Sequence, residues 1–408
     1  MRWNDSTLGE IAKRDGGLIQ TGPFGSQLHQ AEYETEGIPV VMPKDIADGR
    51  ISGASVARVS EQTANRLQRH KLKPRTIVLP RRGEVTKRAY IRDDEDGWLC
   101  GTGCLKIELN GKYLVPEYLY YFMEQGHVIQ WLLQHAVGTT MLNLSAGIVA
   151  ALPIRYPAIE VQTAIADILS TYDDLIENNR RRMALLEDSA RLLYREWFVR
   201  LRFPGHEHTR ITDGVPEGWE RKTVLEAVSV LSGGTPKTSI SDYWDGEIPF
   251  YTPKDATDGI WVMDCERTVT ELGLQNCNSK LYPRETVFIS ARGTVGKLNM
   301  TQCPMVMSQS CYALVGKDHL TQPFVYAAMQ AAVEALRQHA VGAVFDAIVV
   351  DTFRRINLLI PPPSMLRLFD ETVRPLFDQV ENLTLQNQKL RTARDLLLPR
   401  LMSGEIAI

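Results

Sequence analysis

Several features that mark membrane, secreted and zinc proteins are missing from this 408-residue sequence. The first residues, MRWNDSTLGEIAKRDGG, contain no apolar signal core, and no run of about 18 apolar residues occurs. The six cysteines form no CxxC pair, and no histidine lies at zinc-ligand spacing from Cys100 and Cys104. We therefore expect a cytoplasmic protein with buried or free thiols, no bound metal and no membrane partner.

The sequence also lacks the excess of positive charge that is common in nucleic-acid-binding proteins, because its net charge is only −3. Apolar residues make up 44% and charged residues 23%, as in an ordinary globular protein. Any DNA-binding function must therefore rest on local charge. The length exceeds what one hydrophobic core usually serves, which favours two or three domains.

Motifs for catalysis are scarce. The stretch nearest to a phosphate-binding P-loop, ARGTVGKL at 291–298, lacks the first Gly and the final hydroxyl. No GxGxxG and no acidic-Pro-Pro-aromatic motif occurs, and the one [DE]xK triplet, at 220–222, has no PD pair upstream at suitable spacing. His135 and His339 have no evident nucleophile or carboxylate partner, so we interpret them as structural.

What the sequence does contain is an internal repeat. Three pairs of matching segments follow one another in the same order: IPVVMPKDI (38–46) with IPFYTPKDA (248–256), RGEVTK (82–87) with RGTVGK (292–297), and HAVG (135–138) with HAVG (339–342). The first two pairs are offset by 210 residues and the third by 204, which indicates a small net deletion between the second and third pairs. The sequence therefore predicts one module used twice.

Each module has a first part with short apolar runs between Gly and Pro residues, which is typical of strands, together with helical stretches. Its second part carries apolar residues at alternating spacings of four and three, which is typical of a coiled-coil helix. The predicted fold is α+β, with two similar globular α/β domains separated by two long antiparallel coiled-coil helices, in a pseudo-two-fold internal repeat. The predicted boundaries are 1–157 (first globular domain), 158–203 (first long helix), 204–216 (surface linker), 217–361 (second globular domain) and 362–403 (second long helix). We expect Pro399 to end or kink the second helix early.

Two asparagines occupy positions in the apolar pattern of these helices. If the helices pair antiparallel about a pseudo-two-fold axis, Asn179 lies opposite Asn387. Buried Asn pairs commonly fix the register of paired helices at some cost in stability. We therefore hypothesise an Asn179–Asn387 contact; the alternative is that each side chain is independently solvated.

Positive charge is concentrated in residues 66–92, which hold ten Lys or Arg and one acid, Glu84. Such density suits contacts to phosphates, and Arg can also read guanine with two hydrogen bonds; the alternative is a solvated face without a ligand. The loops TGPFGS (21–26) and SGGTPKTS (232–239) contain glycines that either allow close approach to DNA or simply form tight turns. The candidate DNA-binding residues are Gly22, Pro23, Lys44, Arg81, Arg82, Lys87, Arg88, Lys237, Lys254, Arg292 and Lys297.

The ordered motifs of the chain resemble those of type I restriction–modification specificity subunits. The segments that carry this resemblance in the second module are GGTP…DYW.G.IP (233–249), PKD (253–255), RGTVG (292–296), HAVG (339–342), IPPP (360–363) and LLLPRLMSGEI (396–406). The first module matches through IPVVMPKDI, RRGEVTK, HAVGTTMLNL and LLYREWF, so the resemblance covers essentially the whole chain. The family usually has a Gln a few residues after the prolines; here the first module has Gln162, and Leu366 stands in its place in the second.

The resemblance implies a non-catalytic, sequence-specific DNA-binding subunit. Each globular domain would be a target-recognition domain for one half of a bipartite double-stranded DNA sequence, and the paired helices would set the spacing. The implied partners are methyltransferase (modification) subunits and a restriction motor/nuclease subunit. S-adenosylmethionine, ATP and Mg²⁺ would bind to those partners and not to this chain, and target adenines would be flipped into the methyltransferase. An orphan DNA-binding scaffold and a stand-alone nuclease or methyltransferase with unrecognised motifs are the alternatives.

Overall fold

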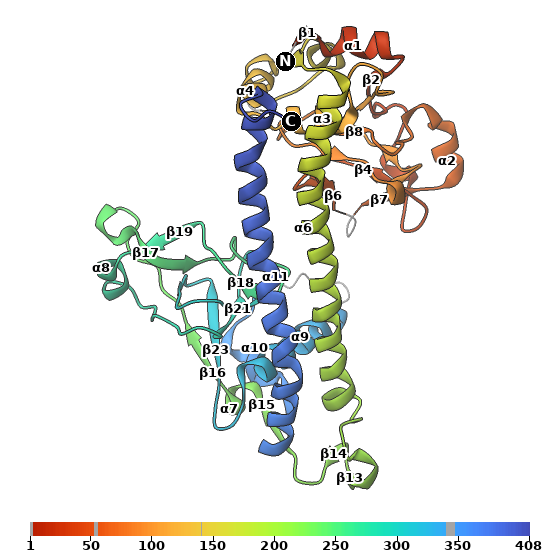
Figure 1. Cartoon of the computed structure of the whole chain (residues 1–408). Helices are drawn as coiled ribbons and strands as arrows, with labels where there is room; N and C mark the ends of the chain where they lie inside the picture. The colour runs from red at the N-terminus through yellow and green to blue at the C-terminus, as the bar shows by residue number, and fades with distance from the viewer. Residues whose placement is uncertain (1–2, 53–55, 140, 340–346) are drawn as a thin grey trace. The chain divides into compact units, whose positions relative to one another are not determined.

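The computed structural model describes residues 3–52, 56–139, 141–339 and 347–408 (Figure 1). The chain divides into two compact units, which we describe separately. Unit 1 comprises Met1–Leu175 and Lys389–Ile408, and unit 2 comprises Ile176–Gln388. Two long helices, α6 (Ile159–Tyr194) and α11 (Pro363–Ser403), each contribute residues to both units.

Unit 1 is built from short strands and short helices. Its strands are β1 (Asn4–Thr7), β2 (Leu18–Thr21), β3 (Tyr33–Glu34), β4 (Ile38–Val41), β5 (Ile46–Ala47), β6 (Arg50–Ile51), β7 (Ala57–Val59), β8 (Ile77–Pro80), β9 (Ala89–Tyr90), β10 (Leu99–Cys100), β11 (Cys104–Glu108) and β12 (Pro153–Tyr156). Its short helices are α1 (Leu8–Asp15), α2 (Glu61–Arg66), α3 (Pro116–Phe122), α4 (Gly126–His135) and α5 (Ala146–Ala150). The strands form sheets in the orders β2-β11-β8-β9, β10-β4-β7-β3, β1-β12 and β5-β6.

Unit 2 has a similar inventory. Its strands are β13 (Ile211–Thr212), β14 (Val215–Pro216), β15 (Glu220–Thr223), β16 (Val228–Ser232), β17 (Trp244–Tyr251), β18 (Trp261–Val262), β19 (Arg267–Val269), β20 (Val287–Ser290), β21 (Leu298–Thr301), β22 (Val306–Met307), β23 (Cys311–Gly316) and β24 (Asn357–Ile360). Its shorter helices are α7 (Val224–Ala227), α8 (Glu271–Gln275), α9 (Gln322–His339) and α10 (Val350–Arg355), and a π-helical turn at Arg195–Val199 follows α6. The sheets have the orders β16-β23-β20-β21-β18, β19-β17-β22, β15-β24 and β13-β14.

The two units repeat one plan, which confirms the predicted internal repeat and the α+β class. The order β2-β11-β8-β9 in unit 1 is matched by β16-β23-β20-β21 in unit 2. The antiparallel pair β1–β12 is matched by β15–β24. The first strand of each of these pairs, β1 or β15, ends on a Thr that caps the next helix in a capping box, with Thr7 and Glu10 in unit 1 and Thr223 and Glu226 in unit 2.

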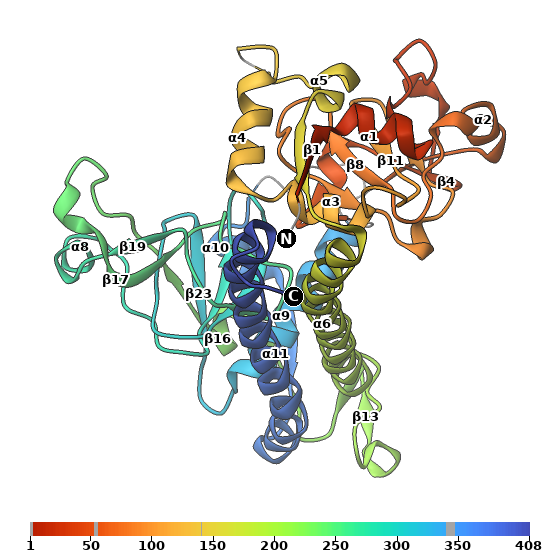
Figure 2. The same cartoon turned by 45° about the horizontal axis from the view of Figure 1, so that its top comes forward.

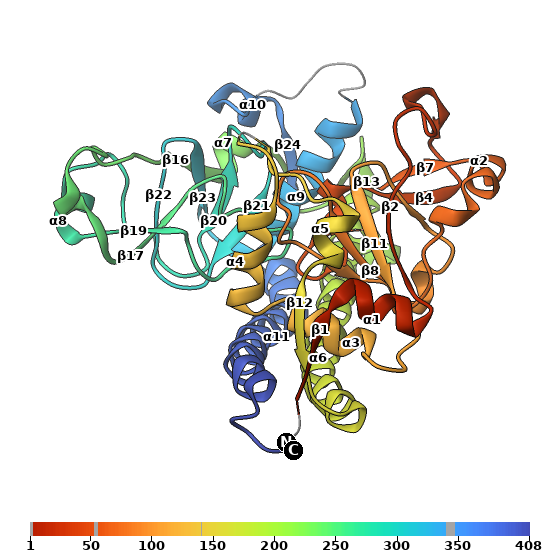
Figure 3. The same cartoon turned by 90° about the horizontal axis from the view of Figure 1, so that it is seen from above.

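The central strand of each main sheet is buried on both faces, because its side chains alternate between two apolar clusters. In β8, Ile77 and Leu79 belong to the cluster that also contains Leu119 of α3, whereas Val78 faces a second cluster. In β20 the same alternation occurs, and α9 packs against this sheet (Figure 3). The loops that leave these buried strands are therefore held on a rigid base.

Within each unit the segments of α6 and α11 run antiparallel and side by side (Figures 1 and 2). In unit 2, Asn179 contacts Asn387, and the Trp197 and Phe369 ring centroids lie 5.9 Å apart. Residue numbers therefore increase along α6 and the turn that follows it in the direction in which they decrease along α11. In unit 1, Asp173 pairs with Arg394 at 2.5 Å between Oδ1 and Nη1. The antiparallel pairing predicted from the sequence is therefore present in both units.

We expected Pro399 to end or kink the second helix early; the early end was wrong, since α11 continues to Ser403, and the kink stays a prediction. Leu398, Leu401 and Met402 are buried in the main cluster of unit 1. Proline removes one backbone hydrogen bond, whereas burying each large apolar side chain contributes about 1.5–3 kcal/mol. Packing of the last two turns therefore outweighs the local cost of the proline.

Candidate nucleic-acid interface

Four connecting segments meet at one end of the β2-β11-β8-β9 sheet in unit 1, which we call the loop end. The Arg81 amide, just after β8, donates to the Gly103 carbonyl at 2.6 Å. The Gly22 amide, just after β2, donates to the Cys104 carbonyl at 2.9 Å, and the Leu144 amide donates to the Arg81 carbonyl at 2.8 Å. The RRG motif and the segment that follows the first HAVG motif therefore lie together, although the sequence separates them by about sixty residues.

The loop end of unit 2 has the same hydrogen bonds. The Ala291 amide donates to the Ser310 carbonyl at 2.8 Å, and the Ile348 amide donates to the Ala291 carbonyl at 2.9 Å. These bonds make Ala291 the counterpart of Arg81, and Arg292 the counterpart of Arg82. Residues 340–342 of the second HAVG motif lie outside the described residues, and the side chain of His339 is not described, so the interpretation of His339 as structural stays a prediction.

The structure does not place Gly22 and Pro23 where they could touch DNA, because both are buried. A methyl group added at Gly22 would lie 2.1 Å from the Gly101 carbonyl oxygen, and one at Gly233 would lie 2.1 Å from the Ser308 carbonyl oxygen. These glycines allow two loops to pack backbone against backbone. The prediction of a DNA contact at Gly22 and Pro23 is therefore corrected to a structural role.

Two exposed cations recur at equivalent positions of the two loop ends. Lys44 and Arg82 are exposed in unit 1, and Lys254 and Arg292 are exposed in unit 2. In unit 2 the Thr294 hydroxyl donates to the Pro253 carbonyl at 2.8 Å, which joins the segment of Lys254 to that of Arg292. Lys237, in the loop after β16, is also exposed.

Two other candidate lysines are already paired inside their own units. Lys87 forms an ion pair with Glu84 at 2.5 Å, and Lys297 forms one with Asp258. Partial burial, together with the nearby Arg337, lowers the pKa of Lys297 from its usual value. Both lysines are less available to an external phosphate than the exposed cations are.

Arg88 is a structural cation, which corrects its prediction as a DNA-binding residue. Its side chain is buried, its Nε donates to the Tyr120 carbonyl at 3.0 Å, and its guanidinium pairs with Glu124. Burial lowers the pKa of Arg88 to about 10. The charge of Arg88 is therefore paired with Glu124 inside unit 1 and is not exposed to a ligand.

Further charges of the basic stretch 66–92 are also neutralised within unit 1. Arg75 makes two hydrogen bonds to Glu117, at 2.7 Å from Nε and 2.9 Å from Nη2, and Arg66 pairs with Glu32. The acids lie 42 and 34 residues away along the chain, so local composition gave no sign of them. The basic stretch is a weaker attractor of phosphates than its count of Lys and Arg suggests.

The sequence interpretation missed Phe24, which lies at the loop end of unit 1. The Arg81 guanidinium lies over its ring, 5.3 Å from the centroid, and the Phe24 side chain is 52% exposed. An aromatic residue between glycines and prolines in an exposed loop, TGPFGS, is the signal that could have identified it.

Asn179 and Asn387 are in contact, as expected from the heptad pattern. Nδ2 of Asn179 donates to Oδ1 of Asn387 at 2.9 Å, and Nδ2 of Asn387 donates to the Ile176 carbonyl at 3.3 Å. Both side chains are buried. That the pair fixes the helix register stays a prediction.

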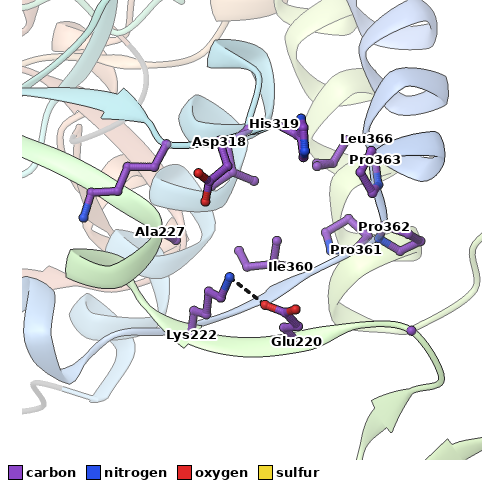
Figure 4. Close-up of a pocket in the computed structure, with 13 residues that line it drawn as sticks. Glu220, Lys222, Ala227, Asp318, His319, Ile360, Pro361, Pro362, Pro363 and Leu366 are labelled. Carbon is purple, nitrogen blue, oxygen red and sulfur yellow. Dashed lines mark ion pairs between the residues drawn. The ribbon is translucent and has the colours of Figure 1, made fainter.

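The two long helices have different residues at one equivalent position near their starts, Gln162 in α6 and Leu366 in α11. In unit 1, buried Gln162 accepts from the Val115 amide at 2.9 Å and donates to the Tyr113 and Pro157 carbonyls, each at 3.0 Å. Its counterpart in unit 2, Leu366, cannot form such bonds. Instead, Leu366 borders a pocket of about 200 Å³. Figure 4 shows its labelled lining residues, which include Pro361, Pro362, Pro363, His319 and an ion pair between Lys222 and Glu220.

Within the part of the chain that the structure describes, no cluster of three or more His, Cys, Asp or Glu side chains is placed to hold a metal ion. Among the same residues, no helix is both long and apolar enough to cross a membrane. The cysteines of the described chain are all free thiols, and burial raises the pKa of Cys100 to about 12.

Comparison with known proteins gives consistent matches. The family model described as "Type I restriction modification DNA specificity domain" matches residues 2–188 and again 216–391. The type I restriction enzyme MjaIX specificity subunit of Methanocaldococcus jannaschii is 25% identical over 428 aligned positions, which span 100% of this chain and 98% of that protein. The HindI specificity subunit of Haemophilus influenzae is 22% identical, over 78% of this chain and 83% of that protein. The crystal structure of a type I restriction–modification S subunit from M. genitalium has the same fold, with a TM-score of 0.56, 16% identity and coverage of 98% and 96%.

Proposed function

The chain belongs to the family of type I restriction–modification DNA specificity domains, since it contains this domain twice, and we propose that it is the non-catalytic DNA-reading subunit of such a system. Each unit reads one half of a bipartite double-stranded target. The observation that carries this proposal is the duplicated loop end, with exposed cations at the same positions in both units.

Every DNA sequence presents the same phosphate backbone. Exposed Lys and Arg side chains bind phosphates and release counterions, and this supplies affinity without sequence information. Lys44 and Arg82 in unit 1, with Lys254 and Arg292 in unit 2, provide such side chains on loops held by buried strands. One copy of the set per unit suits two half-sites.

We assign the target-recognition domains to residues 1–157 and 217–361 and the spacer helices to 158–203 and 362–403, with 204–216 as linker. The observed helices have 36 and 41 residues, which correspond to lengths of about 54 and 62 Å. These lengths exceed one DNA turn of about 34 Å, so the helices can serve as the spacer that sets the distance between half-sites.

The partners in this proposal are methyltransferase subunits and a restriction motor/nuclease subunit, in the cytoplasm. S-adenosylmethionine, ATP and Mg²⁺ act on those subunits, and a target adenine leaves the duplex to enter the methyltransferase. This chain supplies the choice of sequence and a surface on which the partners assemble.

Methylome sequencing of isogenic cells with and without the gene tests the proposal. We expect a bipartite methyladenine motif to vanish on deletion and to return with the wild-type gene. As a matched variant, Lys254→Ala with Arg292→Ala should lower methylation at that motif without replacing it by another. A methylome unchanged by deletion, in cells that express the methyltransferase subunits, would contradict the proposal, as would turnover of DNA by the purified chain alone.

A further inference from the structure

We infer that Arg81, held over the ring of Phe24, reads a guanine in the half-site bound by unit 1, and that unit 2 has no counterpart of this reading pair. The inference rests on the proposed function and specifies which residue of one unit recognises which base.

The backbone around Arg81 in unit 1 and around Ala291 in unit 2 makes the same hydrogen bonds. Arg81 and Ala291 each accept a hydrogen bond from the segment after the HAVG motif, at 2.8 and 2.9 Å. Gly22 and Gly233 each lie against a carbonyl oxygen, which sets the register of the loops that follow. Two residues further on, Thr235 is the counterpart of Phe24.

At the loop ends, some side chains are the same at equivalent positions of the two units and others are not. The exposed cations Lys44 and Arg82 have counterparts in Lys254 and Arg292, and a shared cation fits a ligand present in every half-site, the phosphate. Arg81 and Phe24 are replaced by a small and by a polar residue. A cation present in only one unit fits a ligand that differs between half-sites, which is a base.

Arg81 is also available for a ligand, unlike several other arginines of unit 1. Among the described residues, its side chain forms no ion pair and no hydrogen bond, and its buried Nε has no acceptor. Nearby, Oδ1 of Asn143, which faces Arg82 across a β-bridge, is another buried polar atom without a partner. Because both atoms are buried as the side chains lie, Arg81 and Asn143 must turn outward to meet a ligand, and a polar ligand would then supply the hydrogen bonds that these atoms lack.

The geometry favours guanine among the bases. A guanidinium can donate two parallel hydrogen bonds, which match the O6 and N7 acceptors of guanine in the major groove. The Phe24 ring restrains the Arg81 side chain before binding, so less side-chain entropy is lost when those bonds form. Arg81 thus acts as the base-reading residue, and Phe24 as the residue that positions it.

The test uses the full-length chain and a pool of random-sequence DNA duplexes. Wild-type protein should enrich a bipartite sequence with a guanine in one half-site. Arg81→Ala should abolish the preference at that one position, with a loss of about 5- to 150-fold against the selected target and no change in the other half-site. Arg81→Lys, which keeps the charge but replaces the planar fork of donors by a single ammonium, should weaken the same preference.

Two further variants separate reading from simple attraction. Phe24→Ala should weaken the guanine preference, whereas Phe24→Trp should retain it. Arg82→Ala should instead weaken binding to all sequences alike and reduce the salt dependence by about one counterion. Equal weakening of all sequences by Arg81→Ala would make Arg81 a phosphate contact and overturn the inference while leaving the proposed function intact. Failure of the wild-type chain to enrich any sequence would overturn both.

Discussion

Replacement of the buried asparagines Asn179 and Asn387 by leucine, singly and together, tests the helix pairing. Each single change leaves one amide buried without its partner, because the wild-type pair is joined at 2.9 Å in a buried position. A stranded buried amide costs about 1–3 kcal/mol. We therefore expect each single variant to destabilise unit 2 by about 2 kcal/mol.

The double variant should recover most of this loss. Replacing both partners of a buried hydrogen bond by apolar groups is close to neutral, since no polar group remains unsatisfied. The energies of the two single changes should thus fail to add by about 2 kcal/mol or more, as is usual for residues in contact. Additive energies would refute the reasoning.

Hydrogen exchange by mass spectrometry, on peptides that contain residues 179 and 387, measures this local stability in the full-length chain. A second measurement concerns register. Met183 and Thr384 touch at 3.3 Å between Sδ and Oγ1, so cysteines introduced at both positions should cross-link in the wild-type background. Without the asparagine pair we expect fewer cross-links, because an all-apolar seam permits slipped registers. Equal cross-linking in both backgrounds would show that other contacts set the register.

Three further outcomes concern unit 1. Gln162→Leu, which copies Leu366 of unit 2, should lower the free energy of unfolding by about 3 kcal/mol, because one amide and two carbonyls lose their partner. Urea denaturation measures this loss. As a control at the equivalent position of unit 2, Leu366→Met should cost under about 1.5 kcal/mol. Burial lowers the pKa of His70 to about 4, so the unfolded state binds its proton first, and the stability of unit 1 should fall by up to about 3 kcal/mol as pH drops from 6.5 toward 4. In His70→Leu that part of the pH dependence should disappear. Arg88→Met should destabilise unit 1 by about 3–5 kcal/mol, because Glu124 loses its counterion, and should leave sequence preference unchanged; altered preference in a stably folded variant would place Arg88 at the DNA after all.

The elements that the sequence predicts best are those with a period or a repeat. The long helices were expected at 158–203 and 362–403, and the structure has them at Ile159–Tyr194, with a π-helical turn to Val199, and at Pro363–Ser403. The contact between Asn179 and Asn387 followed from the same pattern, since antiparallel pairing fixes which positions meet. Periodic spacing is a local property, and it is therefore visible in one sequence.

The candidate site was harder to predict, because its outcome depends on contacts between distant segments. Arg88 and Arg75 were counted with the exposed cations, but Glu124 and Glu117 neutralise them through the fold. The role of Gly22 depended on a carbonyl of Gly101, on another loop. A count of charges in a window cannot distinguish a paired cation from a free one.

The duplicated backbone changes how differences between the units should be interpreted. In unrelated domains, an Arg in one and an Ala in the other could reflect different folds. Here Arg81 and Ala291 accept equivalent backbone hydrogen bonds, so the fold around them is the same and the side chain is the variable. At the neighbouring position both units have an exposed arginine, Arg82 and Arg292. Under the proposed function we expect the ligand of the shared pair to be common to both half-sites and that of Arg81 to belong to one, which is the division expected between phosphates and bases.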